Sequence, residues 1–122
     1  ADYISINALA TEETKHMINA DALNLAKKTL ILVNTSRGAL IDEKALADWL
    51  AKNPGAYAGL DVFEEEPLPE DSPLLKLENI ILSDHAGFYS EESLVELKTK
   101  AAQNVAEVLK GNKPLYPVNN PS

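Results

Sequence analysis

Polar side chains that could bind or transform a small molecule follow three apolar stretches of the sequence. These polar ends are Thr35-Ser36-Arg37-Gly38, then Asp61 with Glu64, Glu65 and Glu66 beyond it, and lastly Asp84-His85-Ala86-Gly87. An arginine can hold a carboxylate through two parallel hydrogen bonds, and a histidine can exchange a proton near neutral pH. A carboxylate beside the histidine fixes its tautomer and favours the imidazolium. Arg37, His85 and one of these acids therefore suit a substrate whose carboxylate adjoins a hydroxyl or a ketone.

An alternation of strands and helices positions these residues. The apolar pattern predicts four strands, a middle helix and a long last helix, over residues 3–6, 29–34, 56–62, 79–83, 42–52 and 90–111. Either Thr11 or Asn19 could cap an earlier helical stretch whose apolar residues are Met17, Ile18, Leu23 and Leu25. This alternation predicts an α/β fold with a largely parallel sheet, flanking helices and right-handed crossovers.

The carboxyl ends of parallel strands meet at one edge of the sheet, where open α/β folds bind ligands. We therefore expect four residues to gather on that rim: Arg37, Asp61, Glu66 and His85. The unbroken apolar run 30–33 favours a strand buried on both faces. Gly38 would let the backbone turn sharply behind Arg37, or let a ligand approach closely. The strand would then be a rigid support that presents Arg37 to a ligand.

The amino-acid composition argues against several classes of binding partner. The 122-residue chain has a net charge of −8. This charge argues against binding to nucleic acids or to anionic membranes, which requires a basic surface. No apolar stretch approaches the roughly 20 residues that span a bilayer. Cysteine is absent, which excludes disulfides and thiolate metal sites and is compatible with a cytoplasmic protein.

Simpler explanations compete for each candidate residue. A lone arginine after a strand is most often a surface residue, and an acidic run such as 64–66 is by default a solvated turn. His85 could merely end a strand, and His16 receives no role. Asp61, the glutamates and His85 could in principle hold a metal ion. Their spacing matches no recognisable ligand pattern, so we expect no metal site.

Four sequence blocks occur in an order that favours the chemical interpretation. They read ADYISINALATEETKHMIN, ILVNTSRGALIDEKAL, AGLDVFEEEPLP and SPLLKLENIILSDHAGFYSEE. In residue type and spacing they resemble the D-isomer-specific 2-hydroxyacid dehydrogenases, from Ala1 to Asn119. The resemblance implies an NAD-dependent oxidoreductase that interconverts a small 2-keto acid and a D-2-hydroxy acid. It also implies a homodimer.

The resemblance assigns roles by motif. Arg37 would bind the substrate carboxylate and carbonyl, His85 would donate and accept the proton, and Glu66 would pair with His85. Glu64 and Glu65 would then be bystanders. Cofactor-binding residues would be Asn7, Thr35, Ser36, Arg37, Asp61, His85 and Gly87, with Asp61 on the nicotinamide carboxamide. The family usually has a proline directly before this histidine, where the chain has Asp84.

The same resemblance predicts how the chain is organised. A G-x-G-x-x-G turn, which binds the cofactor pyrophosphate, is absent from the sequence. We therefore expect residues 1–122 to be the C-terminal portion of a Rossmann-type NAD-binding domain, without the separate substrate domain. Residues 1–89 would form its second mononucleotide half, and residues 90–122 a helix and tail returning toward the substrate domain.

Two questions stay open at this point. The missing turn and the acidic residue after it set cofactor preference, so NADP is an alternative to NAD. The alternatives to an enzyme are a dinucleotide-sensing, corepressor-like binding protein of the same fold and an inactive isolated fragment. Turnover of 2-keto acids separates the first of these from a dehydrogenase.

Overall fold

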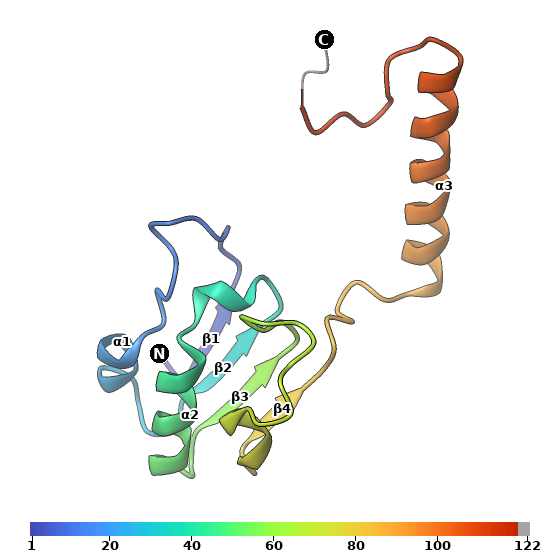
Figure 1. Ribbon diagram of the computed structural model, residues 1–122. Helices are drawn as coiled ribbons and strands as arrows, with labels where there is room; N and C mark the ends of the chain where they lie inside the picture. Colours follow the sequence, from blue (N-terminus) through green and yellow to red (C-terminus); the bar gives the residue numbers. More distant parts are fainter. Residues whose placement is uncertain (120–122) are drawn as a thin grey trace. The chain divides into compact units, whose positions relative to one another are not determined.

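The computed structural model describes residues 1–119, and Figure 1 shows their strands and helices in chain order. The elements are β1 (Tyr3–Ile6), α1 (Ala20–Asn24), β2 (Ile31–Asn34), α2 (Glu43–Lys52), β3 (Tyr57–Leu60), β4 (Ile80–Leu82) and α3 (Glu91–Leu109). Two 3-10 turns, η1 (Gly38–Leu40) and η2 (Pro73–Lys76), lie between them. Residues 120–122, the end of the predicted tail, lie outside the described residues.

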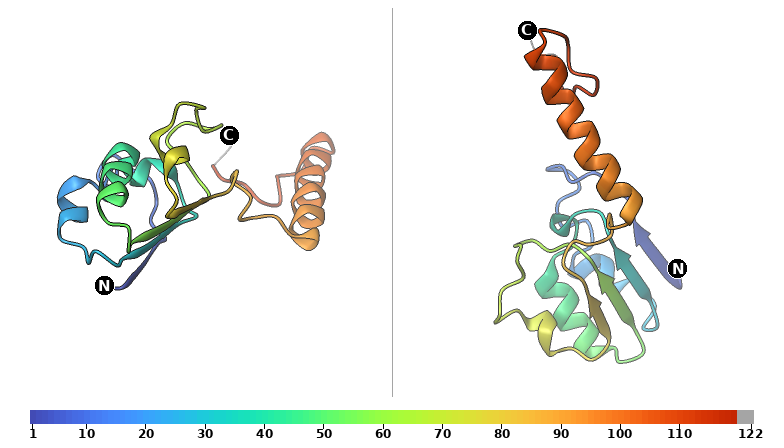
Figure 2. Two further views of the ribbon diagram at one scale, coloured as in Figure 1. Left: turned by 90° about the horizontal axis from the view of Figure 1, so that it is seen from below. Right: turned by 90° about the vertical axis from the view of Figure 1, so that its right-hand side faces the viewer.

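The four strands form one parallel sheet in the order β1-β2-β3-β4, as the two views of Figure 2 show. Tyr3 pairs with Ile31, Ile31 with Tyr57, and Ala58 with Ile80. The predicted α/β fold with a parallel sheet is thus confirmed. The predicted strand 29–34 begins two residues later in the structure, and the predicted strand 56–62 is shorter at both ends, where Asp61 and Val62 leave the sheet.

The helices before and after β2 begin at side-chain caps. Asn19 caps α1 by accepting a hydrogen bond from the Ala22 amide at 3.0 Å, and Asp42 caps α2 through the Ala45 amide at 2.9 Å. Thr11 is not a helix cap. Its carbonyl accepts a hydrogen bond from the Lys15 amide in a separate turn, so Asn19 is the correct choice of the two predicted caps.

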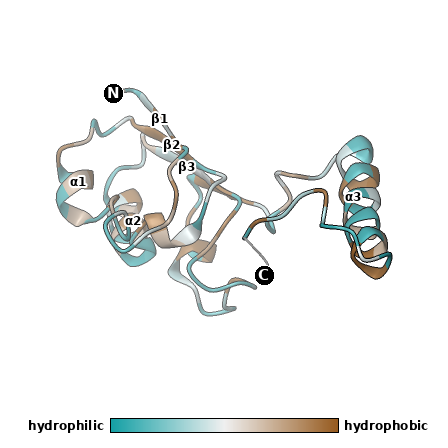
Figure 3. Cartoon of the chain, turned by 90° about the horizontal axis from the view of Figure 1, so that it is seen from above, coloured by the Kyte–Doolittle hydropathy of each residue, from teal (hydrophilic) through white to brown (hydrophobic). Residues whose placement is uncertain are grey.

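The core lies between the sheet and the two short helices. Leu23 of α1 and Leu46 and Leu50 of α2 pack with Leu32 and Leu60 of the strands, and all are at most 2% exposed. Figure 3 shows α1 and α2 on the same side of the sheet. This burial of apolar surface is the main force that fixes the strand ends relative to one another.

The expectation that β2 is buried on both faces is wrong in this chain. Leu32 is 1% exposed, whereas Val33, on the opposite face, is 37% exposed. On the same face Tyr57 is 51% and Ile81 77% exposed. The reason is that α1 and α2 cover one face of the sheet only. The continuous apolar run therefore also places apolar side chains on the face that α1 and α2 leave uncovered.

A second compact unit begins at Phe88 and contains α3. Ser90 accepts a hydrogen bond from the Ser93 amide and Ser93 accepts one from the Ser90 amide, both at 3.0 Å, which forms a capping box. Gly111 ends the helix with a left-handed φ of 84°. The predicted long helix is therefore confirmed, with Ser90 as its cap.

Candidate active site

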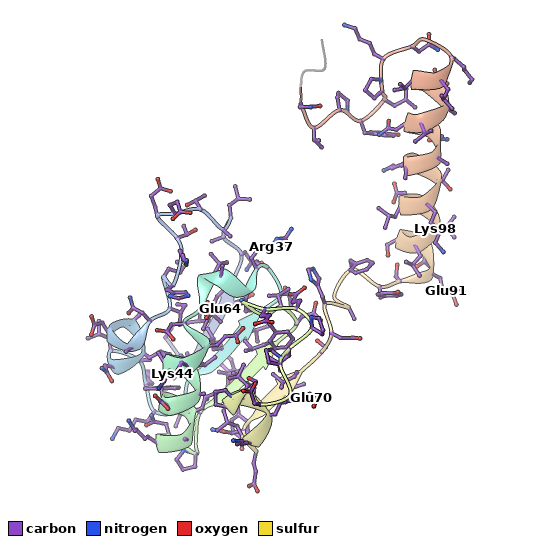
Figure 4. All side chains as sticks on the ribbon, viewed as in Figure 1. Arg37, Lys44, Glu64, Glu70, Glu91 and Lys98 are labelled. Carbon is purple, nitrogen blue, oxygen red and sulfur yellow. The ribbon has the colours of Figure 1, made fainter. Side chains whose placement is uncertain are left out.

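Parallel strands bring the three polar ends of the sequence to one edge of the sheet. Arg37 follows β2, Asp61 follows β3, and His85 follows β4. The backbone links these ends directly, because the Asp61 amide donates to the Asn34 carbonyl at 3.0 Å and the His85 amide to the Asp61 carbonyl at 2.8 Å. Figure 4 shows Arg37 at the carboxyl end of the sheet.

Glu66 and His85 form the central side-chain contact of this rim. The Nδ1 atom of His85 lies 2.8 Å from Oε2 of Glu66, and the two side chains are 44% and 38% exposed. The other carboxylate oxygen, Oε1, accepts a hydrogen bond from the Phe63 amide at 3.0 Å. The hydrogen bond from His85 lowers the pKa of Glu66, assisted by the Phe63 amide and by the positive charges of His85 and Arg37. A carboxylate can only accept, so Nδ1 donates and Nε2 points to the opposite side of the ring.

Asp61 holds the backbone that carries His85. Its Oδ1 accepts from the Ala86 amide at 2.9 Å and from the Ser83 hydroxyl, and its Oδ2 accepts from the Gly87 amide at 2.8 Å. The side chain is 5% exposed. The Ser83 hydrogen bond is the largest cause that lowers the pKa of Asp61, ahead of the two amides. The group is therefore a buried carboxylate held by three donors.

The backbone of His85 adopts the left-handed region, with φ of 55°. This conformation is uncommon for a residue with a side chain and costs on the order of 1–3 kcal/mol. The hydrogen bonds of Asp61 to both following amides hold this turn in place. The strained conformation thus fixes the direction in which the imidazole leaves the backbone.

A buried amide shapes the loop that carries Arg37. Asn34 is fully buried, donates to the Arg37 carbonyl at 2.9 Å and accepts from the Ser36 amide at 3.0 Å. The Ser36 hydroxyl donates to the Ile6 carbonyl at 2.8 Å, which ties this loop to the end of β1. Arg37 itself is exposed, and its Nη1 donates to the Ser36 carbonyl at 2.6 Å. Sequence reasoning missed Asn34, although a polar residue directly after an apolar run could have identified it.

Gly38 is required by a close approach of two backbones. A Cβ atom at this position would lie 1.9 Å from the carbonyl carbon of Phe63 and 2.4 Å from the Glu64 nitrogen. The expected reason for the glycine was a sharp turn or a bound ligand, but the structure gives a third one. The loop after β2 packs directly against the loop that carries Glu66.

The remaining candidate cofactor residues flank this arrangement. Thr35 adjoins Gly87, since a Cβ built on Gly87 would lie 3.9 Å from that of Thr35 and 2.9 Å from Asp61. Asn7 follows β1, is exposed, and donates to the Ser5 hydroxyl at 3.1 Å. Glu66, His85, Asp61, Thr35 and Gly87 are thus brought together. For Arg37 and Asn7, the side-chain hydrogen bonds found are to Ser36 and Ser5, which are close to them in the sequence.

The described residues form neither a metal site nor a membrane-spanning helix. Within residues 1–119, no group of three or more His, Cys, Asp or Glu side chains could hold a metal ion. None of the helices described is long and apolar enough to cross a bilayer.

The part of the chain that carries these site residues is similar to known proteins. Residues 1–87 match the family model of the D-isomer specific 2-hydroxyacid dehydrogenase NAD binding domain. A glyoxylate reductase of Korarchaeum cryptofilum is 46% identical over 119 residues, covering 98% of this chain and 36% of that protein. A D-3-phosphoglycerate dehydrogenase of Methanocaldococcus jannaschii is 43% identical over 122 residues, covering 100% of this chain and 23% of that protein.

A solved structure shows the same fold with ligands bound. The D-lactate dehydrogenase of Aquifex aeolicus, complexed with NAD and lactic acid, superimposes with a TM-score of 0.82 at 31% identity, over 92% of this chain and 38% of that one. The chain therefore spans only 23% to 38% of the length of these relatives. The match to the family model covers most of the chain, and the chain belongs to the D-isomer specific 2-hydroxyacid dehydrogenase family.

Proposed function

We propose that this chain supplies the nicotinamide side of the cofactor site and the proton-handling residues of an NAD-dependent D-2-hydroxyacid dehydrogenase. The observation that carries the proposal is the Glu66–His85 pair, which lies at the carboxyl rim of the sheet beside the buried Asp61. The family match supports it, because the matched part is a NAD-binding domain. The substrate is a small 2-keto acid or the corresponding D-2-hydroxy acid.

His85 and Glu66 would manage the proton on the substrate oxygen. When bound, NADH would supply the hydride for the carbonyl carbon. His85 gives its Nε2 proton to the carbonyl oxygen, so a 2-keto acid, a hydride and a proton yield a 2-hydroxy acid. Glu66 holds Nδ1 at 2.8 Å and keeps the ring in one tautomer, so the proton is delivered through Nε2. In the oxidation direction, the neutral ring accepts the proton at Nε2.

Arg37 would bind the substrate carboxylate. Its guanidinium is exposed at the same rim. The hydrogen bond from His85 is the largest cause that lowers the pKa of Glu66, and the positive charge of Arg37 is the smallest. A guanidinium is planar and presents paired donors, which match a carboxylate. An anionic substrate held there would have its 2-carbonyl near the histidine that protonates it.

The residues present fit one part of the cofactor. A carboxylate offers about four acceptor positions, and three of those on Asp61 are occupied inside the chain, which leaves one for a carboxamide donor. Thr35, Ser36 and Gly87 have small side chains or none, and Asn7 follows the neighbouring strand. The sequence has no glycine-rich phosphate turn, so the proposal assigns no pyrophosphate contact to this chain.

The domain assignment, the homodimer and the cytoplasmic location remain predictions. Residues 1–89 would be the second mononucleotide half of the cofactor domain, and residues 90–122 the segment that returns toward a substrate domain. NAD is the preferred cofactor in this proposal, because NAD is named by the family and bound in the lactate dehydrogenase structure.

The test is turnover by the full-length protein with a panel of 2-keto acids. Reduction of glyoxylate, pyruvate, hydroxypyruvate or 3-phosphohydroxypyruvate with NADH, followed at the nicotinamide absorbance, is the expected result. NADPH in place of NADH measures the cofactor preference. Binding of NADH without turnover of any member of the panel would favour a dinucleotide-sensing binding protein and contradict the proposal.

A further inference from the structure

A second histidine–glutamate pair connects the loop that carries Glu66 with the segment before α1. The Nε2 atom of His16 is 2.8 Å from Oε2 of Glu64. The other oxygen of Glu64 accepts from the Glu43 amide at 3.2 Å, while the Glu43 carboxylate accepts from the Glu64 amide at 2.6 Å. We call His16, Glu43 and Glu64 the loop clamp. Figure 4 shows Glu64, on the loop after β3.

The loop clamp joins two segments that carry candidate catalytic residues. The His16 amide donates to the Ala39 carbonyl at 2.8 Å, in η1, directly after Arg37. The backbone at His16 is left-handed, with φ of 51°, so its side chain leaves the chain in a fixed direction. Through Glu64, His16 thus connects the loop after β2 with the loop after β3.

A short path of contacts leads from the clamp to His85. Glu64 follows Phe63, whose amide donates to Glu66 at 3.0 Å, and Glu66 accepts from His85 at 2.8 Å. Gly38 packs against the backbone of Phe63 and Glu64 without room for a Cβ atom. Loss of the Glu64 side-chain contacts would therefore leave this loop held there only by its backbone contacts and by the hydrogen bonds of Glu66.

Three carboxylates lie near one another in this region. Burial raises the pKa of Glu43, the hydrogen bond from the Glu64 amide opposes this change, and the negative charges of Glu64 and Glu66 add smaller increases. Three carboxylates close together repel one another unless donors hold them. His16 is the side chain that donates to Glu64, and the start of α2 offers the Glu43 amide as a second donor.

We propose that His16, Glu43 and Glu64 are positioning residues that hold Glu66 within hydrogen-bond reach of His85. This inference rests on the proposed function, in which the Glu66–His85 pair moves the proton. It assigns a role to His16, and it gives Glu64 a task distinct from that of the neighbouring Glu65. Glu65 is exposed and, among the residues that the structure describes, makes no hydrogen bond through its side chain.

Kinetics of the full-length protein provide the first test. His16→Ala and Glu64→Ala should lower kcat for 2-keto acid reduction by about 10- to 100-fold, since misplacement of a catalytic group by ~1 Å can cost that much. KM should change by less than about twofold, because Arg37 still binds the substrate. His16→Gln places an amide donor near the Nε2 position and should restore most of kcat. Glu65→Ala, a truncation of the same size on the same loop, should leave kcat unchanged.

A spectroscopic test does not need turnover. In the 122-residue chain labelled with 15N at histidine, the ring nitrogens of His85 report whether Nδ1 carries a proton bound to Glu66. His16→Ala and Glu64→Ala should weaken or abolish this Nδ1–H signature, whereas Glu65→Ala and His16→Gln should keep it. Signals of His85 that are unchanged in both truncations, with only a lower Tm, would overturn the proposal.

The two tests separate this inference from the proposed function. Absence of turnover in the wild-type protein would contradict the dehydrogenase, and the 15N measurement would still decide whether the loop clamp positions Glu66. Normal turnover together with unchanged kcat in His16→Ala and Glu64→Ala would contradict the clamp and leave the dehydrogenase intact.

Discussion

The two histidines of the chain are each paired with a glutamate of the same loop, yet the two pairs differ in what they can do. His16 lies 2.8 Å from Glu64 and His85 lies 2.8 Å from Glu66. Both histidines have a left-handed backbone, with φ of 51° and 55°. The side chains of the two pairs are comparably exposed, at 36% and 35% against 44% and 38%. Distance, strain and exposure therefore do not distinguish them.

The ring nitrogen that each glutamate holds does distinguish the pairs. Glu64 takes Nε2 of His16, the outer nitrogen, which is the one that a proton donor would present to a ligand. Glu66 takes Nδ1 of His85 and so leaves Nε2 on the far side from the carboxylate. His85 is also tied to Asp61 at the carboxyl rim, whereas His16 is tied to Ala39 beside the start of α2. The same pair of residue types can thus serve proton transfer at one place and loop geometry at the other.

Removal of His85 gives the largest expected difference between the two pairs. His85→Ala should lower kcat for 2-keto acid reduction by roughly 10²- to 10⁴-fold, the usual contribution of a general acid. His16→Ala should cost less, because it displaces the catalytic pair without removing the proton donor. The measurement is steady-state kinetics of the full-length protein, with circular dichroism to confirm that both variants fold. A smaller loss at His85 than at His16 would reverse the roles.

A substitution at Gly38 should disrupt both the His16–Glu64 pair and the Glu66–His85 pair. The added methyl group of Gly38→Ala would overlap the Phe63 backbone, which cannot rotate away, so we expect a loss of stability of about 3 kcal/mol or more. Gly59→Ala is the matched control, because its Cβ would meet Val33 at an ordinary 3.9 Å. Urea unfolding of the chain measures both. Equal stability of the two variants would show that the loops after β2 and β3 do not pack as described.

The fold and the rim could be predicted from local patterns. Alternating apolar and capped segments located every strand and the last helix, and parallel topology alone then placed Arg37, Asp61 and His85 at one edge. The error was to take the apolar run 30–33 as evidence of a strand covered on both faces, although Val33 is 37% exposed in this chain. An apolar sequence pattern shows that both faces of the strand carry apolar side chains. It does not show which other segment packs against each face.

The pairing of the acids could not be predicted from the residues alone. Glu64, Glu65 and Glu66 are adjacent in one polar loop, so no periodicity separates them, and only the family resemblance selected Glu66. The partner of Glu64 is His16, which is 48 positions away in the sequence. Such contacts depend on how distant segments of the chain approach each other, and the missing Cβ of Gly38 permits one such approach, between the loops after β2 and β3. The role of Asn34 was missed because a single buried amide leaves no repeated signal.

A substitution at Asp61 should affect one pair and spare the other. Asp61→Asn exchanges an acceptor for a donor opposite the Ala86 or Gly87 amide, and an unsatisfied buried donor costs about 1–3 kcal/mol. The turn that holds His85 should loosen, so the 15N signals of His85 should change while those of His16 stay in place. Matching changes at both histidines would mean that Asp61 stabilises the whole unit rather than the rim.

The smallest predicted effect concerns acid. Because His85 lowers the pKa of Glu66 in the folded state, the stability that Glu66 contributes is complete above the unfolded value and is lost as pH falls through the folded one. The difference in unfolding free energy between wild type and Glu66→Gln should therefore shrink from pH 7 to about pH 3. The pair is more than one-third exposed, so this difference should stay below about 1 kcal/mol. A difference that is unchanged at low pH, or equal to that of Glu65→Gln, would argue against the pairing.

The most direct test of the contrast between the two pairs is a long-range 1H–15N spectrum of the 122-residue chain at about pH 9, where a free imidazole is neutral. The sequence contains only two histidines, so each ring can be assigned by a single substitution. We expect opposite tautomers, with the proton on Nδ1 at His85 and on Nε2 at His16. A spectrum with His85 in the Nε2–H form would contradict this expectation, because Glu66 would then not orient the ring for proton transfer through Nε2.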